Sequence, residues 1–140
     1  RVLSAVETPK FAEYFTRDAA DRYLRDGYVT LFACGTGNPY FTTDTGAVLR
    51  GVEIEADAVL LAKNVDGVYT ADPNKDPNAQ LIPDISYAEA LERRLRVMDT
   101  AAFAMLTEQA IPLVRVFGLA EPENILKVIA GDPRGTVLHP

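Results

Sequence analysis

Short apolar runs alternate with helix-like segments along this chain, and this alternation constrains the fold more than any other sequence feature. Runs rich in strand-forming residues cover residues 28–34, 58–62 and 111–118. Continuous apolar runs of this length are typical of strands that are buried on both faces of a parallel sheet. We therefore predict an α/β fold, a three-layer sandwich in which helices cover both faces of a mostly parallel sheet.

Capping residues predict where several helices begin and end. Thr8 followed by Pro9 is typical of a helix start, and the helix is expected to end near Gly27. Ser86 and Glu89 form a capping-box pattern for a helix that runs to about residue 95. Further helices are expected over residues 42–56, 99–110 and 121–131, with an irregular segment over residues 63–84. Because no repeat or linker marks an internal boundary, residues 1–140 are predicted to form a single domain.

A loop rich in glycine and threonine follows the first apolar run, within the stretch FACGTGNPYFTTDTGAVLRG. A strand, a glycine-rich turn and a helix together favour anion binding, because the helix start presents unpaired N–H groups. Gly35 and Gly37 allow the backbone to approach a ligand closely. The spacing matches neither the dinucleotide-binding fingerprint nor the Walker A loop. On spacing alone, an ordinary strand-to-helix loop with threonine caps explains the segment equally well.

Composition excludes several classes of function. The net charge of -6 argues against a broad nucleic-acid surface. The only histidine is His139, so a histidine-based triad or a multi-histidine zinc site is not expected. The only cysteine, Cys34, excludes an internal disulfide and fits a reducing compartment. No apolar run is long enough for a membrane span, so no membrane partner is expected.

Two motifs carry a resemblance to a known family. GTGNPYFTTD and KNVDGVYTADP resemble the bacterial-type UMP kinases, or uridylate kinases, of the amino-acid kinase superfamily, whose fold is like that of carbamate kinase. The resemblance continues through IPLVRVFGLAEPENILKVIAG and covers essentially the whole chain. It implies transfer of the ATP γ-phosphoryl group to UMP, with Mg²⁺ as cofactor. It also implies that UMP is bound by Thr36, Gly37, Asn38, Pro39, Tyr40, Phe41, Thr42 and Thr43.

The same resemblance assigns roles on the ATP side and at the reacting centre. It places the ATP contacts at Lys63, Tyr69 and Asp72. Asp44 would lie at the junction of the two nucleotides, and Asp99 would be a catalytic residue that reaches Mg²⁺ through water. Without the resemblance, both carboxylates would be explained as helix caps and Asp72 as a turn residue.

The resemblance covers only the C-terminal part of the family's sequence. The family's N-terminal half, which carries a phosphate-binding lysine and completes the UMP pocket, has no counterpart in these 140 residues. We therefore expect the N-terminal portion of the fold to be missing from this chain and the isolated chain to be inactive. The resemblance also implies a cytoplasmic homo-oligomer, a hexamer in the family, with GTP and UTP as effectors.

Two other functions remain open from the sequence. The first is a non-catalytic nucleotide-binding or sensing module of the same fold. The second is an amino-acid kinase that phosphorylates a carboxylate or carbamate. The loop from Thr36 to Thr43 argues against the second, because such enzymes grip a small acid rather than a nucleotide.

Overall fold

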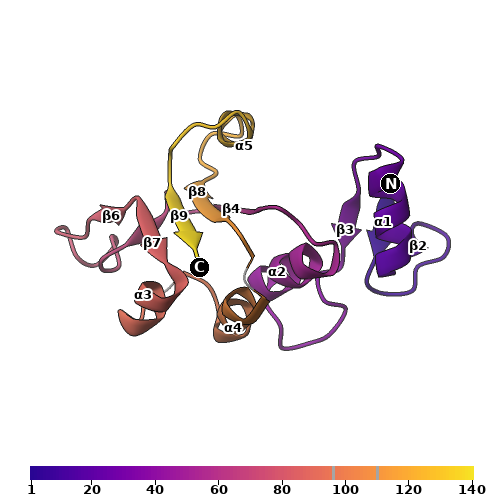
Figure 1. Ribbon diagram of the computed structural model, residues 1–140, viewed down its shortest axis with the longest axis horizontal. Coiled ribbons are helices and arrows are strands. Elements are labelled where there is room, and N and C mark those ends of the chain that lie inside the picture. Colours follow the sequence, from indigo (N-terminus) through magenta and orange to yellow (C-terminus); the bar gives the residue numbers. More distant parts are fainter. Residues whose placement is uncertain (96, 110) are drawn as a thin grey trace. The chain divides into compact units, whose positions relative to one another are not determined.

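The computed structural model describes residues 1–95, 97–109 and 111–140 (Figure 1). Strands and helices alternate along the chain, as the apolar runs predict. The chain divides into two compact units, Arg1–Ala56 and Asp57–Pro140, which we call the N-terminal and C-terminal units. Each unit is described by itself, and the single domain over residues 1–140 stays a prediction.

The N-terminal unit is a small parallel sheet with two helices. Its elements are β1 (Val2–Ser4), β2 (Glu13–Tyr14), α1 (Arg17–Arg25), β3 (Leu31–Ala33) and α2 (Thr43–Glu53). The strand order is β2-β1-β3, and both pairings are parallel. A buried cluster joins β1 to α1, and it contains Leu3, Phe15, Ala19 and Ala20. This unit ends with the helix that follows the glycine-rich loop.

The first helix begins later than predicted. The prediction of a helix start at Thr8 and Pro9 was wrong, because α1 begins at Arg17 with Thr16 as its cap. The backbone after Thr8 makes one tight turn and then enters β2, which pairs with β1. Residues 13–14, which were expected in the first turns of the helix, instead form a strand that pairs with β1. The stop near Gly27 is confirmed, since α1 ends at Arg25.

The first predicted strand is shorter and more exposed than expected. Within residues 28–34 only β3 is a strand, and Leu31 is 60% exposed. β3 lies at the edge of the three-stranded sheet, where only β1 pairs with it among the described residues. The prediction of a buried strand here was therefore wrong about burial and right about the strand.

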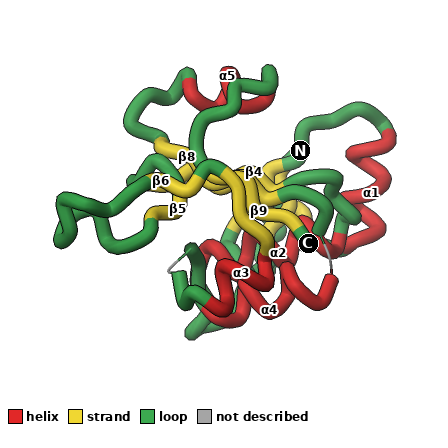
Figure 2. Tube along the Cα trace, turned by 60° about the vertical axis from the view of Figure 1, so that its left-hand side comes forward, coloured by secondary structure: helices red, strands yellow, loops and turns green. Residues whose placement is uncertain are grey.

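The C-terminal unit contains a mixed four-stranded sheet and a separate hairpin. Its elements are β4 (Val59–Lys63), β5 (Val68–Tyr69), β6 (Leu81–Ile82), β7 (Asp84–Ser86), α3 (Tyr87–Glu92), α4 (Thr100–Gln109), β8 (Val114–Gly118), α5 (Asn124–Ile129) and β9 (Thr136–His139). The strand order is β4-β8-β9-β7, and only the β8–β9 pairing in this sheet is antiparallel. Figures 1 and 2 show α3 and α4 on one side of the sheet and α5 on the other. This arrangement is the predicted three-layer order, and the pairings confirm a mostly parallel α/β fold.

Local details of the C-terminal unit differ from the sequence predictions. β4 is not buried on both faces, because Val59 and Leu61 are buried while Leu60 is 40% exposed. The segment predicted as irregular contains the β5–β6 hairpin. The capping box is confirmed, since the Ser86 hydroxyl accepts a hydrogen bond from the Glu89 amide at 3.1 Å. The helix that it begins ends at Glu92, earlier than predicted, and α5 also begins later than predicted.

A buried threonine attaches the hairpin to the sheet. Thr136, the first residue of β9, is fully buried. Its hydroxyl accepts a hydrogen bond from the Val68 amide at 2.8 Å and donates one to the Ile82 carbonyl at 2.6 Å. One side chain thus holds both strands of the β5–β6 hairpin, and this fixes the position of Tyr69 at the end of β5.

Candidate functional site: a glycine-rich loop and a cationic cavity

The glycine-rich loop connects β3 to α2 through a run of left-handed backbone. Cys34, Gly35 and Gly37 have φ angles of 69°, 57° and 75°. The Gly37 amide donates a hydrogen bond to the Cys34 carbonyl at 2.9 Å, which closes a tight turn. Successive left-handed residues favour glycine, because a side chain at positive φ meets the backbone. The main chain of the loop is therefore free of side chains at Gly35 and Gly37.

Close packing against the chain after β1 and against α2 leaves little room for a side chain at two positions. A Cβ atom on Gly37 would lie 2.5 Å from the Ala5 carbonyl oxygen. A Cβ atom on Gly46, in the first turns of α2, would lie 3.3 Å from the Gly35 Cα. The loop thus packs between the chain after β1 and the start of α2, and these two contacts restrict the positions of Gly35 and Gly37.

The middle of the loop exposes polar groups and two aromatic rings. The Thr36 hydroxyl accepts a hydrogen bond from the Asn38 amide at 3.1 Å, and the Asn38 side chain donates to the Thr36 carbonyl at 3.2 Å. Tyr40 is fully exposed, and Phe41 is 55% exposed. Because neither ring is buried in the core of the N-terminal unit, both are available to stack on a planar ligand.

The start of α2 follows directly after these rings. Thr42 is the N-cap, and its side chain accepts a hydrogen bond from the Thr45 amide at 3.2 Å. Thr43 and Asp44 lie in the first turn, where Asp44 is half-buried. The N-terminus of this helix carries partial positive charge, which favours an anionic ligand or an acidic side chain. All of the predicted UMP residues and Asp44 therefore lie in one continuous segment of the N-terminal unit.

A cavity in the C-terminal unit brings two of the predicted ATP residues together. Tyr69 and Asp72 both line a cavity of about 460 Å³ between the hairpin and the end of α3. A volume of this size lies within the range of small-molecule sites. Asp72 accepts hydrogen bonds from the amide of Asn74 at 3.0 Å and from its side chain at 3.3 Å. The hydrogen bond from the Asn74 amide is the main cause that lowers the pKa of Asp72, which keeps this carboxylate ionised.

Three cationic side chains line the same cavity and were not predicted as site residues. Lys75 lies 3.6 Å from the Asp72 carboxylate, and Arg93 pairs with Glu89 at 3.0 Å. Arg94 follows the end of α3, where its φ of 53° gives it a left-handed backbone. Cations beside a tyrosine and a carboxylate suit a ligand with a ring, hydroxyl groups and phosphates. No motif joins these residues in sequence, because the fold brings α3 to the hairpin.

Lys63 and Asp99 occupy other positions in the C-terminal unit. Lys63, at the end of β4, is not among the described residues that line the cavity, and its ammonium group donates to the Val97 carbonyl at 2.7 Å. The Asp99 carboxylate accepts hydrogen bonds from the Ala101 and Ala102 amides at 2.9 and 3.0 Å. Asp99 therefore caps α4, as its residue type predicts. Lys63 forms a hydrogen bond with Val97, which lies two residues before Asp99.

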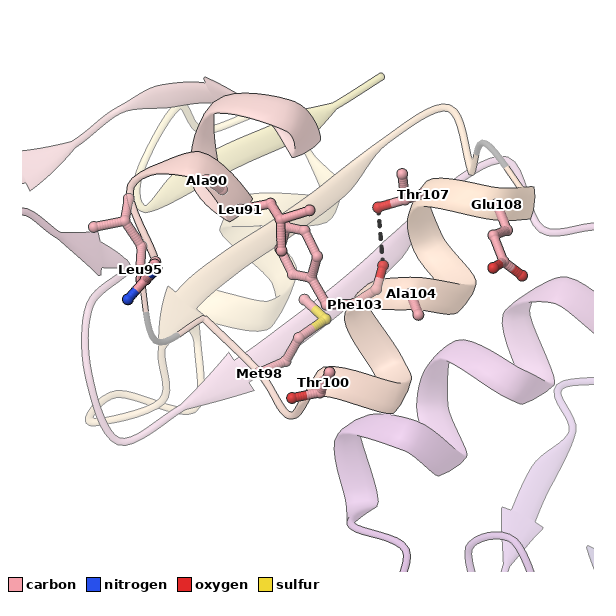
Figure 3. Close-up of a pocket in the computed structure, with 10 residues that line it drawn as sticks. Ala90, Leu91, Leu95, Met98, Thr100, Phe103, Ala104, Thr107 and Glu108 are labelled. Atoms are coloured by element: carbon pink, nitrogen blue, oxygen red, sulfur yellow. Dashed lines mark hydrogen bonds between the residues drawn. The ribbon is translucent and has the colours of Figure 1, made fainter.

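A second cavity in this unit is mostly apolar. It has a volume of about 430 Å³ and lies between α3 and α4, where Leu91, Met98 and Phe103 line it (Figure 3). The Thr107 hydroxyl, which also lines it, donates to the Phe103 carbonyl at 3.0 Å. This cavity shares Arg94 with the cationic cavity. It was not predicted from the sequence.

No group of three or more His, Cys, Asp or Glu side chains in residues 1–95, 97–109 and 111–140 is placed to hold a metal ion. Over the same residues, no helix has the length and apolar character needed to cross a membrane.

Comparison with known proteins identifies the family. Residues 4–116 match the Amino acid kinase family, so the chain belongs to that family. The chain is 54% identical over 138 residues to the uridylate kinase of Rhodopseudomonas palustris (strain BisB18) and 52% identical over 136 residues to that of Porphyromonas gingivalis. These alignments cover 99% and 97% of this chain but only 58% and 56% of the relatives. The resemblance to uridylate kinases that the two motifs carry is confirmed.

Solved structures give the same result for the fold. The chain is similar to the crystal structure of UMP kinase from Ureaplasma parvum, with a TM-score of 0.90 and 35% identity. It is also similar to that of UMP kinase from Bacillus anthracis, with a TM-score of 0.91 and 32% identity. Each comparison covers 99% of this chain and 59% or 57% of the other. The predicted amino-acid kinase fold is therefore confirmed, and this chain spans somewhat more than half of it.

Proposed function

We propose that the complete gene product containing this chain is a UMP kinase, which transfers the γ-phosphoryl group of ATP to UMP and forms ADP and UDP. The observation that carries the proposal is the glycine-rich loop, which joins positive-φ glycines, two exposed aromatic rings and a helix start in one continuous segment. The similarity to uridylate kinases over 99% of the chain supports the same substrate.

On this proposal, the loop binds UMP through several kinds of contact. Main-chain N–H groups and hydroxyls of the loop surround the monophosphate and ribose, and Tyr40 or Phe41 stacks on the uracil. The binding residues are Thr36, Gly37, Asn38, Pro39, Tyr40, Phe41, Thr42 and Thr43. Asp44 acts where the two nucleotides meet, and its role is to orient cationic groups around the transferred phosphoryl group. A phosphate oxygen of UMP is the nucleophile, so the reaction needs no dedicated general base.

The cationic cavity of the C-terminal unit is the proposed ATP site. Tyr69 packs on the base or ribose, and Asp72 accepts hydrogen bonds from the ribose hydroxyls. Arg93 and Arg94 offset the charge of the phosphates, which is the main electrostatic need of phosphoryl transfer. Lys63 contributes through its position at the end of β4 rather than by lining this cavity.

The residues present fit a magnesium ion that is held mainly by the substrates. Mg²⁺ keeps several waters and needs only one or two carboxylates in addition to phosphate oxygens, so no protein cage is required. Asp99 is the proposed contact, through water, because the Ala101 and Ala102 amides hold its carboxylate in one orientation. When bound, Mg²⁺ neutralises charge on the phosphates.

The test is a kinase assay on the complete gene product with ATP, Mg²⁺ and a panel of UMP, CMP and carbamate. Release of ADP only with UMP would support the proposal. Turnover of carbamate would favour a carbamate kinase instead. Binding of ATP and UMP without turnover would favour the non-catalytic nucleotide-binding module.

A matched pair of variants tests the role of Asp44. Asp44 and Asp18 both lie in the first turn of a helix, α2 and α1 respectively. Asp44→Asn should lower kcat by about 100-fold or more, because it removes charge from the reacting centre. Asp18→Asn removes the same kind of helix-terminal charge and should leave kcat within twofold. Equal effects of the two variants on kcat would contradict the role of Asp44.

Assembly, regulation and location are proposed on the same basis. We expect a homo-oligomer, a hexamer if it follows the family, whose activity responds to GTP and UTP and whose location is the cytoplasm. Light scattering of the complete gene product measures its assembly, and the kinase assay with and without GTP or UTP measures its regulation. A monomer that ignores both nucleotides would contradict them.

A further inference from the structure

Arg50, on α2, is a buried charged residue that the proposed mechanism does not use. It is 9% exposed. Burying a guanidinium group is costly unless ion pairs and hydrogen bonds satisfy it. Glu53, one turn further along α2, forms an ion pair with it. That pair neutralises the charge, but it does not require the guanidinium group to point into the protein.

Two further contacts explain the direction of the Arg50 side chain. Its guanidinium carbon lies 3.8 Å from the centre of the Phe15 ring, which belongs to the buried cluster of the N-terminal unit. Its second terminal nitrogen donates a hydrogen bond to the Gly35 carbonyl at 3.3 Å. One side chain therefore connects α2, the core and the glycine-rich loop.

The contact with Gly35 controls the direction of a loop amide. In a planar trans peptide the C=O of one residue and the N–H of the next point in opposite directions. When Arg50 holds the Gly35 carbonyl toward itself, the Thr36 N–H must point to the opposite side of the loop. Glycine restricts rotation of the Gly35–Thr36 peptide less than other residues do, so the hydrogen bond from Arg50 can favour one direction of this peptide.

We propose that Arg50 is a positioning residue for the phosphate of the acceptor nucleotide. It fixes the Gly35–Thr36 peptide so that the Thr36 N–H faces the bound monophosphate. Phe15 and Glu53 hold the guanidinium group in place for this contact. This inference rests on the proposed binding of UMP by the loop, and it assigns the orientation of the loop to a residue outside it.

The experiment compares Arg50→Met and Arg50→Lys in the complete gene product. Arg50→Met removes the donor to Gly35, and we expect the KM for UMP to rise about tenfold, with the KM for ATP within twofold of the wild type. Arg50→Lys keeps the charge but has a single ammonium group, which cannot contact Glu53 and Gly35 with the same forked geometry. We expect Arg50→Lys to raise the KM for UMP selectively as well, but by a smaller factor. This variant can replace Arg50→Met in the test if the methionine variant does not fold.

Hydrogen exchange at residues 35–38 gives a second readout that does not depend on activity. The Gly37 amide, bonded to the Cys34 carbonyl at 2.9 Å, should exchange about tenfold faster in Arg50→Met, because the loop loses its fixed orientation. Arg115→Met is the matched control. Arg115 also donates to two main-chain carbonyls, at 3.3 and 3.1 Å, but it lies on β8 in the C-terminal unit. It should change neither the KM for UMP nor the exchange of the loop.

The outcomes separate this inference from the proposed function. A selective rise in the KM for UMP with faster loop exchange supports the positioning role. Equal changes in both KM values, or unchanged loop exchange, would overturn it. If the wild-type protein does not use UMP, the proposed function fails, and loop exchange in Arg50→Met against Arg115→Met then decides alone whether Arg50 orients the loop.

Discussion

Replacement of Thr136 by valine tests whether one hydroxyl holds the β5–β6 hairpin in place. Valine has nearly the same shape as threonine, so Thr136→Val removes the hydroxyl without opening a cavity. The hydroxyl bonds the Val68 amide at 2.8 Å and the Ile82 carbonyl at 2.6 Å. Both main-chain groups would lose their partner beside a fully buried side chain.

The expected cost follows from those two groups. A buried donor or acceptor left without a partner costs about 1–3 kcal/mol, and the Ile82 carbonyl is only partly buried, so some water can reach it. We therefore expect Thr136→Val to lower the free energy of unfolding by about 2–4 kcal/mol. Thr136→Ser is the matched control, because it keeps the hydroxyl and loses one methyl group, at about 1 kcal/mol.

Urea unfolding of the complete gene product, followed by circular dichroism, measures both variants. We expect the midpoint to fall more for Thr136→Val than for Thr136→Ser, with the same dependence on urea. Because the hairpin carries Tyr69, the KM for ATP should also rise more in the valine variant. The reasoning would be refuted if the valine variant were as stable as the wild type, or if the serine variant were the less stable of the two.

Three other predictions follow from local geometry. Gly37→Ala should weaken UMP binding strongly, because alanine at a φ of 75° costs about 1–2 kcal/mol and its Cβ would meet the Ala5 carbonyl. Isothermal titration with UMP measures this effect, and an unchanged affinity would contradict it. A side-chain hydrogen bond from Arg134 is the main cause that lowers the pKa of Asp132 from 3.8 to about 2. The stability from this contact is present above pH 3.8 and is lost as the pH falls toward 2. The free energy of unfolding of Asp132→Asn should therefore change less with pH between 3.8 and 2 than that of the wild type. Tyr87→Phe should lower the unfolding free energy by about 1–2 kcal/mol, because the buried hydroxyl donates to a main-chain carbonyl; equal urea midpoints would show that this bond contributes nothing.

Sequence predictions succeeded where neighbouring residues decide the structure. Ser86 and Asp99 cap helices as their types predict, because a short polar side chain reaches amides two or three residues ahead. Gly35 and Gly37 have positive φ angles, which glycine adopts without the steric cost of a side chain. The mostly parallel α/β fold followed from alternating patterns that each span fewer than about 20 residues.

The predictions failed where distant contacts decide. Thr8 and Pro9 have the residue types of a helix start, but the residues that follow pair with β1. Arg93 and Arg94 were not predicted as site residues, and they line the cavity of Tyr69 because the hairpin folds back against the end of α3. The roles of the predicted site residues stay predictions, to be decided by the nucleotide assays above.

By itself, the sequence determined the family, the glycine-rich loop and two of the helix caps. Those features depend on residue type and short spacing. Only the tertiary structure decided that Arg50 reaches Gly35 and that Thr136 bonds both strands of the β5–β6 hairpin. It also decided that three cations meet at one cavity. These contacts join residues that are distant in the chain. Burial of side chains and pairing of strands bring the residues together, so no short sequence motif predicts the contacts.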